Sequence, residues 1–218
     1  FKKYDLNMNE NEFEIINNSA KFEKLKKIVI ENSKFLLSIL IIILLSIVGF
    51  FIYNDVKKKN RIKISEKYNK LLVSENLNDN VDELIEIILE RDKTYSPLAL
   101  YYIIDNNLAV TDDEINRYFD IIINEVGLEE NLKYLNIYKM SLFNAQLENE
   151  IEFLKIIEPL LKSENIWKSH GLYLLGEYYY AKGDKIKSKK YFNEIVLNKN
   201  TNSKIKMEAQ KRIQRDLS

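Results

Sequence analysis

Hydrophobic residues are distributed in two contrasting ways along this chain of 218 residues. From Phe35 to Tyr53 the sequence FLLSILIIILLSIVGFFIY contains no charged residue, and only Ser38, Ser46 and Gly49 depart from a large apolar or aromatic character. From residue 54 onward, apolar residues recur at helical spacing between short polar loops. The pattern predicts one continuous apolar helix followed by a domain built of amphipathic helices.

The apolar segment 35–53 is long enough to cross a membrane. Nineteen residues at a rise of 1.5 Å cover roughly 28 Å, which is close to the hydrocarbon thickness of about 30 Å. A buried core helix would normally show a polar stripe, and a cleaved signal peptide would end in small residues, whereas this segment ends in Phe50-Phe51-Ile52-Tyr53. We therefore predict an uncleaved transmembrane helix, with Lys34 and Tyr53 at the two membrane interfaces.

The remainder of the chain is predicted to be helical throughout. Residues 54–73 continue the transmembrane helix, and Val81, Leu84, Ile85, Ile88 and Leu89 form a helical stripe in the next segment. Further helices are predicted at about 96–108, 111–126, 128–146, 149–163, 167–182, 184–198 and 203–217.

Local sequence signals set several of these boundaries. Ser96-Pro97 is typical of a helix start with proline at the first helical position, and Thr111 followed by Glu114 has the form of a capping box. Gly127 and Gly183 lie where helix C-termini need a residue with positive φ. Because no segment shows sustained two-residue alternation, the predicted fold class is all-α, as a tetratricopeptide-like α-solenoid behind the single N-terminal transmembrane helix.

A degenerate repeat signature is clearest in the segment HGLYLLGEYYYAKGDKIKSKKYFNEIVLN. The residues that match the tetratricopeptide pattern are Leu175, Gly176, Tyr179, Gly183, Ser188 and Phe192. Glycine at 176 allows close helix approach, and the aromatic residues fill the space between helices; Ile195 and Asn200 depart from the pattern. Of Tyr178, Tyr179 and Tyr180, we expect one or two in the core and one available to a groove.

The predicted domain organisation has three parts. Residues 1–34 form a tail that is partly disordered, since residues 1–20 are polar and rich in asparagine. An amphipathic helix over 20–34, through Phe22, Leu25 and Ile28, lies on the membrane surface or runs into the span. The transmembrane helix occupies 35–53, and the helical repeat domain occupies 54–218.

Composition excludes most catalytic chemistry. The chain has no cysteine and one histidine, which excludes disulfides, thiolate metal sites and centres that need two histidines. Asp112, Asp113 and Glu114 are explained by the capping box, and His170 is expected to be a surface or packing residue. We predict no catalytic residue, no cofactor, no metal and no small-molecule substrate. Because 33 basic residues balance 33 acidic ones, we also do not expect a nucleic acid as a partner.

The arrangement of tail, span and degenerate repeats resembles the YfgM-type ancillary subunits of the SecYEG translocon. The resemblance rests on the run KLKKIVIENSKFLLSILIIILLSIVGFFIYNDVKKKNRIKISEKYNKLL and on the repeats that follow it, over roughly residues 20–217. It implies a bacterial inner-membrane protein with a cytoplasmic N-terminus, a periplasmic repeat domain, and the translocon and a PpiD-like chaperone as partners.

Charge alone leaves the orientation open. Five lysines precede the span and six basic residues follow it within about fifteen residues; this slight excess favours a cytoplasmic C-terminal domain, against the family resemblance. Lys57, Lys58 and Lys59 are expected to contact anionic head groups or translocon loops, or simply to snorkel at a solvated helix end.

The predicted function is a non-enzymatic, membrane-anchored protein-interaction module that links the translocon to periplasmic chaperones through the concave surface of its repeats. Three alternatives stay open at this point: a scaffold that faces the cytoplasm, a holdase for unfolded clients, and a regulator that sequesters a soluble factor.

Overall fold

The computed structural model describes residues 23, 26–27, 30–73, 80–146, 149–199 and 201–217. Over these residues the regular elements are α-helices, without a β-strand, so the predicted all-α class is confirmed. They are α2 (Ser33–Leu72), α3 (Val81–Leu89), α4 (Tyr95–Asp105), α5 (Asp112–Asn124), α6 (Glu130–Phe143), α7 (Glu150–Lys162), α8 (Ile166–Ala181), α9 (Lys185–Leu197) and α10 (Ser203–Asp216). The chain divides into two compact units, residues 1–60 and 61–218.

Helix α2 contains the whole apolar segment. It is 40 residues long, and its most apolar stretch of 18 residues buries nothing against the rest of the protein. The hydroxyl of Ser38 donates to the carbonyl of Phe35 at 2.7 Å, and that of Ser46 donates to the carbonyl of Ile42 at 2.8 Å. Both hydroxyls are thus satisfied inside the helix, as a hydrocarbon environment requires. Length and composition make α2 able to span a membrane.

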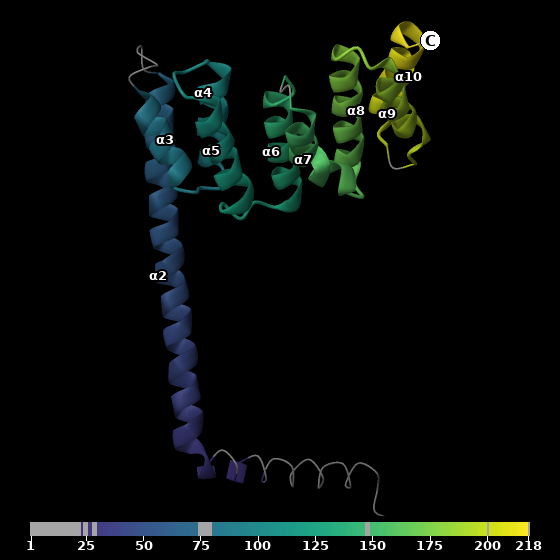
Figure 1. Cartoon of the computed structure of the whole chain (residues 1–218). Helices are drawn as coiled ribbons and strands as arrows, with labels where there is room; N and C mark the ends of the chain where they lie inside the picture. The colour runs from purple at the N-terminus through teal and green to yellow at the C-terminus, as the bar shows by residue number, and fades with distance from the viewer. Residues whose placement is uncertain are drawn as a thin grey trace, which may run out of the picture. The chain divides into compact units, whose positions relative to one another are not determined.

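In the second unit, successive helices pack against their neighbours in chain order, as in an α-solenoid (Figure 1). The first core lies among α3, α4, α5 and the last turns of α2, and its centre consists of Leu84, Ile88, Leu100, Ile103, Phe119 and Ile122. The second joins α6, α7 and α8 around Phe153, Ile157, Leu160 and Leu175. The third joins α8, α9 and α10 around Leu172, Phe192, Ile195 and Ala209. The domain therefore has a row of small cores, in keeping with repeat architectures.

The predicted capping box at the start of α5 is confirmed. The Thr111 side chain accepts from the backbone N–H of Glu114, and the Glu114 carboxylate accepts from the backbone N–H of Thr111. The Thr111 hydroxyl also donates to Glu114 at 2.7 Å, and these hydrogen bonds hold the pKa of Glu114 below its ordinary value. Gly127 and Gly183 follow α5 and α8 with φ of 67° and 80°, as helix C-termini demand.

The predicted start of α4, with Pro97 as the first helical residue, is wrong by two residues, and the capping mechanism is different. The helix begins at Tyr95, and the carboxylate of Asp92 accepts from the backbone N–H groups of Thr94 and Tyr95 at 2.8 and 2.9 Å. Ser96 is instead buried, and its hydroxyl donates to the carbonyl of Ile87 in α3 at 2.9 Å. Pro97 still lies in the first turn, where the missing N–H costs nothing.

Other helix boundaries differ from the sequence prediction by up to three residues, and the two largest differences are at the C-termini of α4 and α6. Helix α4 ends at Asp105 instead of 108, where Asn107 adopts a positive φ of 50°, a conformation that asparagine tolerates. Helix α6 ends at Phe143 instead of 146. The disordered tail predicted for 1–20, and most of the helix predicted for 20–34, lie outside the described residues.

Replacing Thr111 by alanine is expected to lower the free energy of unfolding by about 1 kcal/mol, because the backbone N–H of Glu114 loses the side chain that caps it. Thr94→Ala is the matched control, since Thr94 precedes α4 without a side-chain cap bond and loses only an exposed hydrogen bond from Arg61. Chemical denaturation of both variants measures the difference. Equal losses in the two variants would contradict a specific role for the capping box.

Candidate functional site

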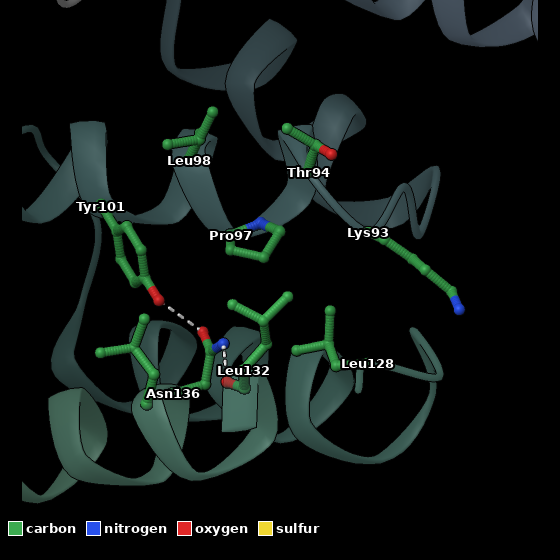
Figure 2. Close-up of a pocket in the computed structure, with 9 residues that line it drawn as sticks. Lys93, Thr94, Pro97, Leu98, Tyr101, Leu128, Leu132 and Asn136 are labelled. Atoms are coloured by element: carbon green, nitrogen blue, oxygen red, sulfur yellow. Dashed lines mark hydrogen bonds between the residues drawn. The ribbon is translucent and has the colours of Figure 1, made fainter. Parts of the chain in front are cut away.

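An open apolar pocket lies between α4 and α6. Its volume is about 260 Å³, and its walls come from the turn before α4, from α4, from Leu128 in the loop before α6 and from α6 itself (Figure 2). The lining residues are Lys93, Thr94, Pro97, Leu98, Tyr101, Leu128, Leu132, Leu135 and Asn136. The lining is mostly aliphatic, so a ligand that fills it must itself be apolar.

The polar groups in the pocket are already satisfied by each other. The Tyr101 hydroxyl donates to the Asn136 side-chain oxygen at 2.7 Å, and the Asn136 amide donates to the carbonyl of Leu132 at 2.7 Å (Figure 2). Asn136 is only 2% exposed, and burial raises the pKa of Tyr101, which stays neutral at any physiological pH. Since these groups are paired internally, the pocket floor offers a fixed, dry surface instead of hydrogen bonds.

Cations lie at the pocket's edge. The Lys139 ammonium lies over the Tyr101 ring, 3.9 Å from its centroid, in a cation–π contact. Lys93 is exposed and makes no ion pair with another described residue. An apolar ligand that carries a negative charge beside its apolar part would therefore find a cation at the rim.

The pocket was not anticipated from the sequence. Its signal is the partial exposure of two leucines that line it, Leu98 at 39% and Leu132 at 43%. The exposure of these leucines depends on how far apart α4 and α6 lie. The pattern of apolar residues along either helix does not predict that distance.

The structure brings most of the repeat-signature residues together at the contact between α8 and α9. A Cβ atom on Gly176 would lie 2.7 Å from two ring atoms of Phe192, so only glycine fits there. The buried Ser188 hydroxyl donates to the carbonyl of Gly176 at 2.8 Å, and Leu175 is fully buried. Gly183 forms the turn between the two helices. These residues form a packing interface, in which Gly183 at the turn is exposed and the others are buried.

Two of the three consecutive tyrosines of α8 are buried in the core, as expected, but the third does not line the pocket. Tyr178 and Tyr179 are both 3% exposed, and Tyr180 is half-buried beneath the Arg212 guanidinium, 4.5 Å from its ring centroid. The Tyr179 hydroxyl donates to Glu150 of α7 at 2.7 Å, and its ring stacks on Tyr191. All three therefore serve packing, and none lines the α4–α6 pocket.

His170 packs among aromatic rings. Its ring centroid lies 5.5 Å from that of Tyr138 and 5.3 Å from that of Trp167. Burial lowers the pKa of His170, so the imidazole is neutral at physiological pH. This environment suits the packing role predicted for His170.

The residues predicted for the membrane interface all lie on α2. Lys34 and Tyr53 flank the apolar segment 19 residues apart, and Tyr53 is 64% exposed. Lys57, Lys58 and Lys59 follow within the same helix, and Lys59 pairs with Asp55 at 2.7 Å. Part of the positive charge of this run is thus paired within α2 itself.

Comparison with protein-family models, with curated proteins and with solved structures finds no match. Over the described residues, fold and site together define a class: a helical, solenoid-like protein with one helix able to span a membrane and an apolar pocket on its helical domain.

Proposed function

We propose that the chain is a non-enzymatic, membrane-anchored protein-interaction module whose degenerate repeats are of tetratricopeptide type. In this proposal it is an ancillary translocon subunit of the YfgM type, held in the bacterial inner membrane by residues 35–53, with its helical domain in the periplasm. There it links SecYEG to a PpiD-like chaperone during protein export. The resemblance in layout and the apolar span of α2 support this proposal.

The observation that carries the interaction role is the pocket between α4 and α6. A half-exposed pair of leucines over a floor with no free hydrogen-bonding group suits one or two apolar side chains of a helical or extended protein segment. Such a site binds by burial of apolar surface. Both a partner segment and an exported chain can provide apolar side chains for this contact.

A test combines two substitutions at the pocket. We expect Leu98→Asp with Leu132→Asp to reduce recovery of translocon and chaperone components in mild-detergent co-purification about tenfold or more, because carboxylates then replace the apolar contact surface. Ile151→Asp with Leu142→Asp is the matched control, since both residues are exposed, at 80% and 46%, and neither lines the pocket.

Two results oppose the proposal. Recovery of neither translocon nor chaperone components with the native chain would overturn the translocon assignment. Equal recovery with the pocket variant and the control would overturn the role of the pocket. Thermal unfolding of both variants shows that any loss comes from the surface and not from misfolding.

A scaffold that faces the cytoplasm is the second candidate, favoured by the six basic residues after the span against five before it. Protease treatment of spheroplasts separates the two orientations. Digestion of the helical domain supports the periplasmic assignment, and protection until the membrane is opened supports the scaffold.

A further inference from the structure

The zero net charge of the chain conceals two oppositely charged regions of the helical domain. Residues 80–130 contain 13 acidic and three basic residues, whereas residues 182–217 contain 11 basic and four acidic ones. The first region forms α3, α4 and α5, and the second forms α9 and α10. Helices α6, α7 and α8 lie between them in the packing order (Figure 1). The domain is therefore electrostatically polar from one end to the other.

Helix α9 of the basic region exposes both unpaired lysines and apolar side chains. Lys185 and Lys189, one turn apart on α9, are exposed and make no ion pair with a described residue, whereas Lys187 between them pairs with Glu150 at 3.0 Å. Ile186 and Leu197 on the same helix are 85% and 81% exposed. This combination, here named the α9 face, exposes both free positive charge and apolar area.

The acidic region has a matching surface on α3. Asp82, Glu83 and Glu90 are exposed and make no ion pair with a described residue, while Glu86 pairs with Lys67. Leu89 beside them is 43% exposed. We name this surface the α3 face. It carries the charge opposite to that of the α9 face and also exposes an apolar side chain.

We propose that the α9 face of one chain docks on the α3 face of a second copy of the same chain. An anionic lipid surface or an acidic protein would match the α9 face alone, and an anionic leaflet would repel the α3 face. A second copy satisfies both surfaces at once. Anchoring of all copies in one bilayer, which belongs to the function proposed above, adds a high local concentration.

This contact joins two different surfaces, so it is heterologous. After two copies pair, one keeps a free α3 face and the other a free α9 face, so the association continues to a ring if the geometry closes and to an open row if it does not. The association must weaken with salt, because both surfaces are exposed to solvent. The Debye length, over which charges interact, falls from about 30 Å at 0.01 M to about 3 Å at 1 M ionic strength.

The test uses charge reversal with complementation. Full-length chains are reconstituted in vesicles of neutral lipid, and donor and acceptor dyes are attached at Gln210→Cys, which is the only thiol because the native chain has no cysteine. Energy transfer then reports association. We expect Lys185→Glu with Lys189→Glu, or Glu83→Lys with Glu90→Lys, to weaken association on the order of tenfold or more, and a mixture of the two variants to restore it.

Lys133→Glu with Lys155→Glu is the matched control, since both lysines are exposed on α6 and α7 outside the two faces, and it should associate as the native chain does. Absence of energy transfer in the native chain at low salt overturns the proposal. So does equal transfer in all variants, or transfer that appears only when anionic vesicles replace the neutral ones, which identifies the bilayer as the occupant. Restoration in the mixture cannot arise from misfolded variants.

Discussion

Replacement of Phe192 by alanine is expected to lower the free energy of unfolding by about 3–5 kcal/mol. Phe192 is fully buried and central to the core among α8, α9 and α10. Its ring contacts the helix α8 backbone at Gly176 and lies edge-on to Tyr173, with centroids 5.2 Å apart. A loss of this size is a large fraction of the 5–15 kcal/mol that stabilises a typical domain. Chemical denaturation measures it, with the exposed Asn193→Ala on the same helix as the control.

The contact between Gly176 and Phe192 gives this prediction a sharper form. Gly176→Ala in the native background should be destabilising, because the new methyl group would lie 2.7 Å from the ring of Phe192, which is fully buried and packed against Tyr173. In the Phe192→Ala background the clash is gone, so the same substitution should stabilise the protein by up to about 1 kcal/mol through helix propensity. If Gly176→Ala destabilises the native chain but stabilises the Phe192→Ala variant, the close approach of the two residues is identified. Equal effects of Gly176→Ala on the free energy of unfolding in both backgrounds would contradict it.

The sequence predicts those features that depend on neighbouring residues. The capping box of α5 uses residues three apart, and the glycine turns at 127 and 183 need only a local positive φ, so both could be recognised directly. The helical stripe of α3 was nearly correct as well, although Ile87 is buried and Leu89 is largely exposed. There the tertiary neighbours rotate the buried face slightly away from the predicted one.

Features that depend on distant residues were missed. The α4–α6 pocket requires Tyr101 and Asn136, which are 35 residues apart, to meet without closing the space around them. Ser96 looked like a helix cap, but its hydroxyl is used by Ile87 in the preceding helix. Gly171, which carries no repeat signature, is also a close approach, because a Cβ there would lie 2.9 Å from the Cβ of Leu160. Each depends on how two helices pack.

Two aspartates in the apolar segment are expected to release the chain from the membrane. The segment contains 15 Leu, Ile, Phe and Val residues, each worth about −0.3 to −0.6 kcal/mol at the centre of a span, whereas each aspartate costs about 2.5–3.5 kcal/mol. Leu44→Asp with Leu45→Asp therefore removes two favourable contributions and adds a penalty of about 5–7 kcal/mol, comparable to the entire gain. Insertion becomes close to balanced or unfavourable.

Extraction with alkaline carbonate measures this change, since integral proteins stay in the pellet. The native chain should pellet, and the double variant should shift largely to the supernatant or be degraded. Ile151→Asp with Ile186→Asp makes the same chemical change at two residues that are 80% and 85% exposed on the helical domain, and it should pellet as the native chain does. Because Ser38 and Ser46 satisfy their hydroxyls within α2, the native segment has no comparable polar penalty. Full retention of the double variant in the pellet would contradict residues 35–53 as the anchor and place the membrane attachment elsewhere in the chain.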